Sequence, residues 1–222
     1  MGKNKLERFE ENLTFPNLFH VSYEFLQQNT FHLKGKWNSD FFKNNNPIVL
    51  ELGCGKGEYT VNLAKKYPNK NFIGIDIKGA RLWRGCKTSN EDKMENVAFI
   101  RTRIQLIENF FAADEVSEIW ITFPDPQLKK PNKRLTCERF LSYYKKIAKN
   151  NSIVHLKTDS YELYDYTINE VIAEGKYPVV FHTDDLYASD FYDDVKDVRT
   201  FYEQMFLDMG KKITYIQFKL QQ

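Results

Sequence analysis

The chain has 222 residues, with 32 lysines and arginines against 30 aspartates and glutamates, so its formal net charge at pH 7 is +2. This length favours one domain with a buried core, and the balanced charge excludes any argument for a polyanionic or membrane partner from net charge alone. Cys54, Cys86 and Cys137 are odd in number and far apart, which excludes a disulfide framework and a cysteine metal site. No apolar run is long enough to span a membrane and the first residues are charged rather than signal-like, so we expect a cytoplasmic protein.

Residues 1–46 lack a long periodic pattern, yet they contain many aromatic side chains. A polar run at 44–46, followed by Pro47, separates them from the rest of the chain. So many aromatic residues are unusual in a disordered tail. We therefore expect an N-terminal extension, residues 1–46, packed on a main domain that spans residues 47–222, with a substrate-binding arm as the alternative.

An apolar run that contains Glu51 leads into three glycines at alternate positions, Gly53, Gly55 and Gly57. The pattern predicts a strand, a tight turn and a helix. Because glycine has no side chain, the turn allows a ligand to lie against the main chain where the helix begins. A dinucleotide fingerprint would need a further glycine where Glu58 stands, and the carboxylate of Glu51 would repel a pyrophosphate. These features favour a ligand without phosphates.

A second apolar run, residues 71–76, closes on Asp76, about twenty residues after the glycines, which is the separation expected of one strand-helix-strand unit. S-adenosylmethionine suits this pair of acids. Its ammonium would face Glu51, its carboxylate the helix N-terminus, and its ribose hydroxyls Asp76. The sequence therefore predicts a nucleoside-containing cofactor held by Glu51, the glycine turn and Asp76.

The rest of the chain alternates short apolar strands with helices, which is typical of a mostly parallel sheet covered by helices on both faces. We expect helices at 59–67, 80–93, 106–111, 135–149, 161–174 and 200–209, strands at 97–102, 117–123, 153–157, 179–181 and 212–220, and a long loop at 184–197. Ligands of such sheets bind beyond the carboxyl ends of the strands. Five charged residues fall there: Glu51, Asp76, Arg103, Asp125 and Asp159.

A rigid turn and a basic run follow the strand at 117–123. Asp125 stands between two prolines, which preset the backbone, and four cations come next: Lys129, Lys130, Lys133 and Arg134. By itself this is a turn followed by a solvated charge run. Beside a cofactor site, the cations are candidates for RNA phosphate contacts that would bring a base towards Asp125. A second basic series, Lys78, Arg81, Arg84 and Lys87, is either another phosphate track or an ordinary surface helix.

Together with residues 50–57 and Thr158-Asp159, the Phe123-Pro124-Asp125-Pro126 turn and its basic run resemble the bacterial tRNA (guanine-N7)-methyltransferases, over about residues 48–205. The resemblance implies a single Rossmann-like class I methyltransferase domain, with S-adenosylmethionine as cofactor and tRNA as partner. It implies methylation of N7 of a guanine in the tRNA variable loop. We expect a monomer or homodimer, and no metal, since the four histidines show no ligand spacing.

The resemblance also implies roles for individual residues. Cofactor contacts would come from Glu51, Gly53, Gly55, Asp76, Arg103 and Asp125, with Asp125 at the catalytic centre, and substrate contacts from Lys129, Asp159, Thr200, Phe201, Tyr202 and Glu203. The chain departs from the family pattern in three places. Arg103 stands where the family often has an aspartate, Gln127 replaces an aromatic residue, and the basic run is interrupted by Pro131 and closes on Leu135.

Guanine N7 has a free lone pair and no proton to lose, so its methylation needs no general base. As the methyl group moves, positive charge develops on the guanine ring, and a carboxylate near the base gains interaction in the transition state. Asp125 is the candidate. A class I methyltransferase that acts on another RNA or on a small molecule is the alternative function. An oxidoreductase that binds NAD is disfavoured by the glycine spacing, and an RNA-binding module would leave Glu51 and Asp76 without a role.

Overall fold

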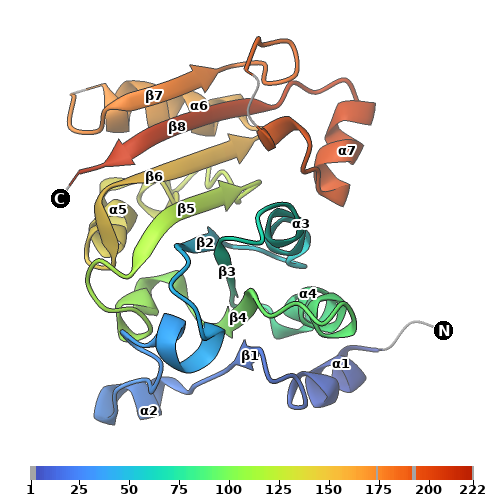
Figure 1. Ribbon diagram of the computed structural model, residues 1–222. Coiled ribbons are helices and arrows are strands. Elements are labelled where there is room, and N and C mark those ends of the chain that lie inside the picture. The colour runs from blue at the N-terminus through green and yellow to red at the C-terminus, as the bar shows by residue number, and fades with distance from the viewer. Residues whose placement is uncertain (1–3, 174, 192–193, 222) are drawn as a thin grey trace.

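The computed structural model describes residues 4–173, 175–191 and 194–221. Its centre is an eight-stranded sheet in the order β1-β4-β3-β2-β5-β6-β8-β7 (Figure 1). The strands are β1 (Leu18–Phe19), β2 (Ile48–Leu52), β3 (Asn71–Asp76), β4 (Val97–Arg101), β5 (Val116–Thr122), β6 (Ala148–Thr158), β7 (Val179–Thr183) and β8 (Thr214–Leu220). The pairs from β1 to β6 are parallel, and β8 is antiparallel to both β6 and β7.

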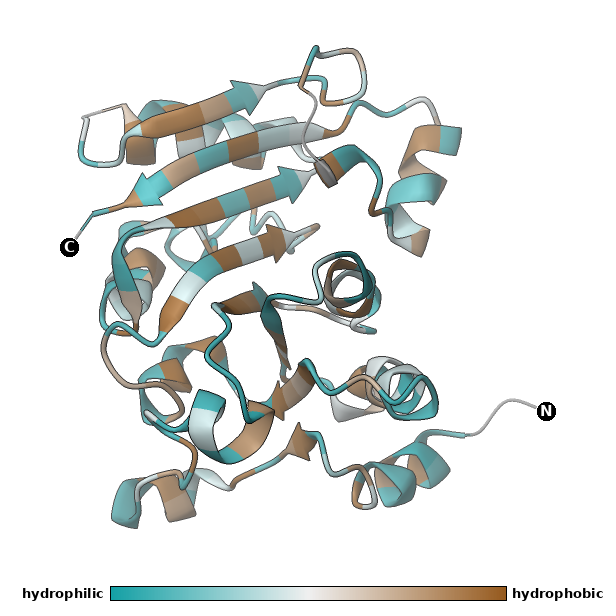
Figure 2. Cartoon of the chain, in the orientation of Figure 1, coloured by the Kyte–Doolittle hydropathy of each residue, from teal (hydrophilic) through white to brown (hydrophobic). Residues whose placement is uncertain are grey.

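Helices cover both faces of this sheet, as the sequence predicts. The α-helices are α1 (Lys5–Asn12), α2 (Tyr23–Gln28), α3 (Glu58–Lys66), α4 (Gly79–Glu91), α5 (Glu138–Lys145), α6 (Tyr161–Tyr166) and α7 (Phe201–Asp208). Neighbouring residues of β2 point to opposite faces: Leu50 packs in one core with Trp37, and Val49 packs in another with Tyr59. The first core is closed by α5, α6 and the N-terminal residues, and the second by α3 and α4. Figure 2 shows the hydrophobic residues concentrated on the strands between these layers.

Residues 4–46 extend the sheet and complete one of its cores. β1 pairs with β4 through Leu18 and Phe99, and the indole of Trp37 is fully buried and donates a hydrogen bond to the Phe110 carbonyl oxygen (2.9 Å). The side chain of Asn12 donates to the Gly79 carbonyl oxygen (2.9 Å), which ties α1 to the start of α4. The buried aromatic side chains of residues 4–46, such as Trp37, therefore belong to the same core as Leu50 of β2.

Three expected elements differ from the structure. The expected helix at 135–149 is only α5, since β6 already begins at Ala148, where it pairs with Val116 before a register shift. The expected helix at 161–174 is α6 followed by a wider π-helix, Thr167–Ile172, where the Thr167 hydroxyl donates to the Leu163 carbonyl oxygen (2.8 Å). The helix expected at 106–111 is a 3₁₀-helix at Ile104–Asn109.

Short irregular helices complete the list: a π-helix at Trp37–Phe42 and 3₁₀-helices at Pro131–Lys133 and Asp194–Lys196. Among the residues described, no helix has the length and apolar character that crossing a membrane requires.

Candidate active site

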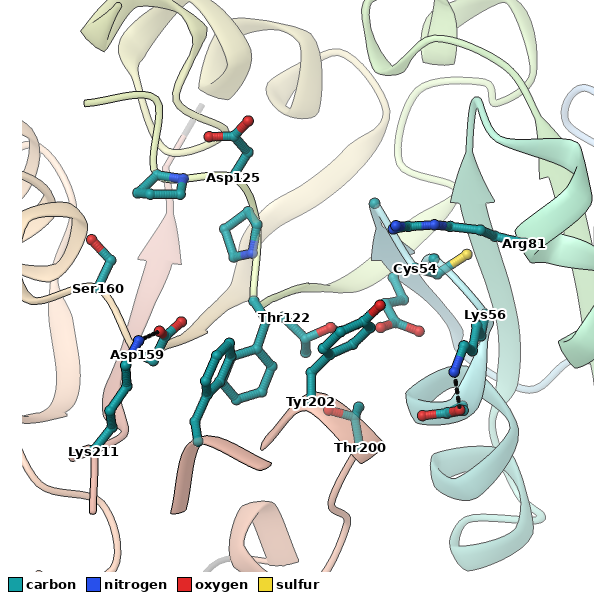
Figure 3. Close-up of a pocket in the computed structure, with 18 residues that line it drawn as sticks. Cys54, Lys56, Arg81, Thr122, Asp125, Asp159, Ser160, Thr200, Tyr202 and Lys211 are labelled. Atoms are coloured by element: carbon teal, nitrogen blue, oxygen red, sulfur yellow. Dashed lines mark hydrogen bonds and ion pairs between the residues drawn. The ribbon is translucent and has the colours of Figure 1, made fainter. Parts of the chain in front are cut away.

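A cavity of about 500 Å³ opens at the carboxyl ends of β2, β5 and β6 (Figure 3). Three segments that follow these strands form its walls: the glycine turn after β2, the proline turn after β5, and Asp159 with Ser160 after β6. Thr200 and Tyr202, at the start of α7, close the remaining side. Parallel strands thus bring together polar residues, from Glu51 to Ser160, that lie far apart in the chain.

A buried carboxyl group, that of Glu51, forms the floor of the cavity. It accepts hydrogen bonds from the Thr60 backbone N–H (2.8 Å), from the Thr60 hydroxyl and from the Thr122 hydroxyl (2.6 Å). Burial nevertheless raises the pKa of Glu51 to about 7, because these hydrogen bonds only partly replace the lost water. A cation bound in the cavity would lower that pKa and fix the carboxylate form.

The glycine turn needs glycine for two different reasons. Gly53, Gly55 and Gly57 have φ angles of +75°, +58° and +68°, a left-handed region that other residues rarely adopt. A Cβ atom on Gly57 would also collide with the buried ring of Phe99, at 2.5 Å. A Cβ atom on Gly55 would meet nothing within 4 Å, so this residue leaves space at the cavity wall. Gly57 is required for packing, and Gly55 keeps the cavity open.

Asp76 lies next to the cavity and supports the glycine turn. Its carboxylate accepts hydrogen bonds from the backbone N–H groups of Gly55 (2.9 Å) and Lys78 (2.7 Å). It is half-buried and is not one of the residues that line the cavity. Arg103, at the start of a 3₁₀-helix, is exposed and also lies outside the lining.

The proline turn holds Asp125 at the cavity wall. The backbone is left-handed on both sides of it, with φ +47° at Phe123 and at Gln127, and the Gln127 N–H donates to the Asp125 carboxylate (3.0 Å). Arg134 is buried and stabilises this turn. Its Nε donates to the Pro126 carbonyl oxygen (3.1 Å), and its guanidinium lies 4.3 Å from the ring centre of Tyr166. The backbone therefore fixes the direction of the Asp125 side chain.

The cations of the basic run fall into two groups. Lys129, Lys130 and Lys133 are exposed, whereas Arg134 is buried against the turn that it supports. The prediction that Arg134 is a phosphate contact is therefore wrong, because its guanidinium is used inside the protein. The three lysines remain candidates for this contact.

Charged side chains and aromatic rings lie together at two further places around the cavity. Asp159 pairs with Lys211 (2.7 Å), and the Lys211 ammonium lies 4.6 Å from the ring centre of Phe206. Lys56 lies 5.0 Å from the ring centre of Phe201 and 5.7 Å from that of Tyr202. Tyr202 lines the cavity, and Phe201 is exposed beside it.

Glu203 is buried and does not line the cavity, so the prediction that it contacts the substrate directly is wrong. It is fully buried, pairs with Lys157 (2.6 Å) and accepts a hydrogen bond from the Tyr187 hydroxyl (2.7 Å). It also forms a capping box with Thr200, whose hydroxyl accepts from the Glu203 N–H (3.1 Å). The Lys157 ammonium also donates a hydrogen bond to the Val195 carbonyl oxygen (2.7 Å). The contacts of Lys157 with Val195 and Glu203 therefore hold the segment that carries Thr200 and Tyr202 in place.

Several lining residues were not predicted: Cys54, Lys56, Thr122, Phe206 and Lys211. The first three have a signal in the sequence, because they stand inside or directly before a predicted motif. Phe206 and Lys211 have none, since they reach the site only through the pairing of β8 with β6.

Comparisons with known proteins agree with this geometry. Residues 45–216 match a family model described as a putative methyltransferase. The chain is 53% identical to a tRNA (guanine-N(7)-)-methyltransferase of Bacteroides fragilis, over the whole chain and 88% of that protein. It is 55% identical to a protein of the same name from Christiangramia forsetii, over 99% of each chain.

Solved structures support the fold. The 16S rRNA methyltransferase KamB superposes with a TM-score of 0.66 at 11% identity, over 88% of this chain and 96% of that one. A SAM-dependent methyltransferase from Aquifex aeolicus superposes with a TM-score of 0.55 at 15% identity, over 99% of this chain and all of that one. The predicted fold class, a Rossmann-like methyltransferase domain with a mostly parallel sheet, is confirmed.

Proposed function

This chain belongs to the tRNA (guanine-N(7)-)-methyltransferase family, and we propose that it transfers a methyl group from S-adenosylmethionine to N7 of a guanine in tRNA, in the cavity at the carboxyl ends of β2, β5 and β6. One observation carries the assignment of the site. A buried carboxyl group beside an open glycine turn shares one cavity with a carboxylate that prolines hold in place.

The residues of the β2 side fit S-adenosylmethionine. Glu51 offers a buried carboxyl group to an ammonium, and Gly55 leaves open space where a side chain would otherwise stand. Asp76, next to the cavity, would accept hydrogen bonds from the ribose diol in place of those from its backbone partners Gly55 and Lys78. When bound, S-adenosylmethionine supplies a methyl group on a positively charged sulfur. Gly53 and Gly55 let its amino-acid end approach the backbone before α3.

Asp125 is the catalytic residue of the proposal. The guanine ring becomes positively charged as its N7 is methylated, and the Asp125 carboxylate is held at the cavity wall by the Gln127 N–H before any substrate arrives. A preorganised carboxylate of this kind stabilises the developing charge without having to reorient. It accepts no proton, because N7 has none to give.

The other wall supplies contacts for the base and for its backbone. Asp159 accepts hydrogen bonds, Thr200 also lines the cavity, and the exposed ring of Tyr202 offers a surface on which a base can stack. Lys129, Lys130 and Lys133 are exposed beyond the proline turn and bind phosphates in this proposal. N7 faces the deep groove of an RNA helix, so the guanine must leave its stack to reach the cavity.

The test is a methylation assay on unmodified tRNA with methyl-labelled S-adenosylmethionine, followed by reductive strand cleavage to locate 7-methylguanine. We expect label in tRNA and cleavage at a guanine of the variable loop. Label that appears at another atom, or no label in any tRNA, would contradict the proposal.

A further inference from the structure

Three cations stand at the N-cap and in the first turns of α4: Lys78, Arg81 and Arg84, here called the α4 ridge. All three are exposed, and none is paired with a carboxylate among the residues described. Lys87, one turn further along, is different. It pairs with Glu11 (3.4 Å) and Glu91 (3.6 Å) and packs over Trp83. Of the four cations of this series, the first three therefore have no carboxylate partner among the residues described.

A groove of about 210 Å³ lies beside the cavity, between α3 and α4. It shares Lys56 and Glu58 with the cavity wall, and Asn62, Arg84 and Thr88 line it further on. The lining is rich in hydrogen-bond donors. Its acid, Glu58, is already occupied, because its carboxylate accepts from the Phe201 N–H (3.0 Å) and lies 3.7 Å from the Lys56 ammonium.

The groove and the ridge lie on one side of the cavity, and the proline turn lies on another. Figure 3 shows Arg81 and Lys56 on the α4 side, away from Asp125, Asp159 and Lys211. Arg81 lines the cavity itself, and Arg84 lines the groove, so these two cations continue outward from the cavity on the side of the glycine turn.

A guanosine that leaves its stack exposes the phosphates on both of its sides, and the strand must be held on each side for the base to stay in the cavity. Guanidinium and ammonium groups bind these phosphates, and asparagine and threonine side chains suit ribose hydroxyls. We propose that the α4 ridge and the α3–α4 groove bind the tRNA backbone on one side of the target guanosine, as a second phosphate site besides Lys129, Lys130 and Lys133. This inference rests on the proposed function, which supplies tRNA as the substrate.

The experiment measures tRNA binding against salt concentration for two double variants of the full chain. Lys78→Gln/Arg84→Gln removes two ridge charges and leaves Arg81, which lines the cavity, in place. Lys87→Gln/Lys146→Gln removes the same charge from two lysines that are paired inside the protein, Lys146 being 2.6 Å from Glu108. We expect the slope of log K against log salt to fall by about 2 for the ridge variant, about 1 for each lost phosphate contact, and to stay unchanged for the control.

Two further measurements make the result specific. Affinity for S-adenosylmethionine, measured by calorimetry, should be the same in both double variants and the unaltered protein. Arg84→Lys keeps the charge and should keep the salt slope. Equal slopes for the ridge variant and its control would overturn the inference. Its failure is distinct from failure of the proposed function, since the unaltered protein would still form 7-methylguanine in tRNA in the first case and would not in the second.

Discussion

At the scale of single residues, Asp125 gives the sharpest test of the chemistry. Asp125→Asn keeps the size of the side chain and its acceptor oxygen for the Gln127 N–H but removes the charge. We expect the single-turnover rate at saturating tRNA to fall by on the order of a hundredfold, with a much smaller loss of tRNA affinity. Asp40→Asn, at an exposed aspartate outside the cavity, is the matched control and should leave the rate unchanged.

The pH profile of the same reaction separates charge stabilisation from base catalysis. The rate of the unaltered protein should be flat from neutral pH upward, because no proton leaves the nucleophile. A rate that rises through neutral pH, and loses this rise in Asp125→Asn, would show that Asp125 acts as a base.

Glu51 makes the stability of the fold depend on pH. Its pKa is about 7 in the folded protein, against an ordinary value of 4.5, because burial disfavours the charged form. Between these values the folded protein holds a proton that the unfolded chain has released, so stability falls as the pH rises through this window. The contribution is complete below pH 4.5 and is lost above 7, with a size of up to roughly 3 kcal/mol.

Glu51→Gln removes this titration. Urea unfolding at pH 5 and pH 8, without cofactor, should show that the unaltered protein loses more stability between the two values than the variant does. An equal loss of stability in both proteins would mean that Glu51 is already charged at pH 5 and that water hydrates its carboxyl group.

At the scale of elements, a substitution at Gly55 tests whether the open space at the glycine turn is needed for cofactor binding. A valine at Gly55 would extend into the space that the cavity needs, at a backbone that is left-handed. We expect Gly55→Val to abolish binding of S-adenosylmethionine in calorimetry. Gly175→Val is the matched control, since Gly175 is also left-handed (φ +71°) with nothing near its Cβ position, and it lies outside the cavity. Both variants bear a similar backbone cost of about 1–2 kcal/mol, so a loss of binding in both would point to misfolding instead.

The helices, strands and turns also show which features of the structure can be predicted from local sequence patterns. The strand, turn and helix around Glu51 and the position of Asp125 follow from local patterns, because strand ends and proline turns leave local signals. The buried positions of Arg134 and Glu203 do not follow from local patterns. A basic run and a Thr-x-x-Glu segment look the same whether their charges face solvent or a buried partner. Lys157, which neutralises Glu203, stands in a strand whose sequence gives no sign that it is buried on both faces.

At the scale of the whole molecule, we propose that residues 4–46 are required for the main domain to fold. They contribute Phe31, Leu33, Trp37 and Phe42 to one core, and each large side chain removed from a core costs about 3–5 kcal/mol. A chain that begins at Pro47 should therefore show no cooperative thermal transition by circular dichroism. A chain that begins at Phe15 loses only α1 and should still melt cooperatively. A sharp transition for the chain beginning at Pro47 would show that residues 47–222 form an independent domain.

The order of the strands also determines the order in which the site can be completed. β8 follows β7 in the chain, yet it lies between β6 and β7 and is the partner of both. β7 therefore has no neighbour to pair with until β8 has taken its place, and the chain joining these strands includes Thr200 and Tyr202. During synthesis the glycine and proline turns can form early, whereas the wall that faces the base must wait for β8. A nascent chain would thus assemble the β2 side of the cavity, where the cofactor is proposed to bind, before it can hold an RNA base.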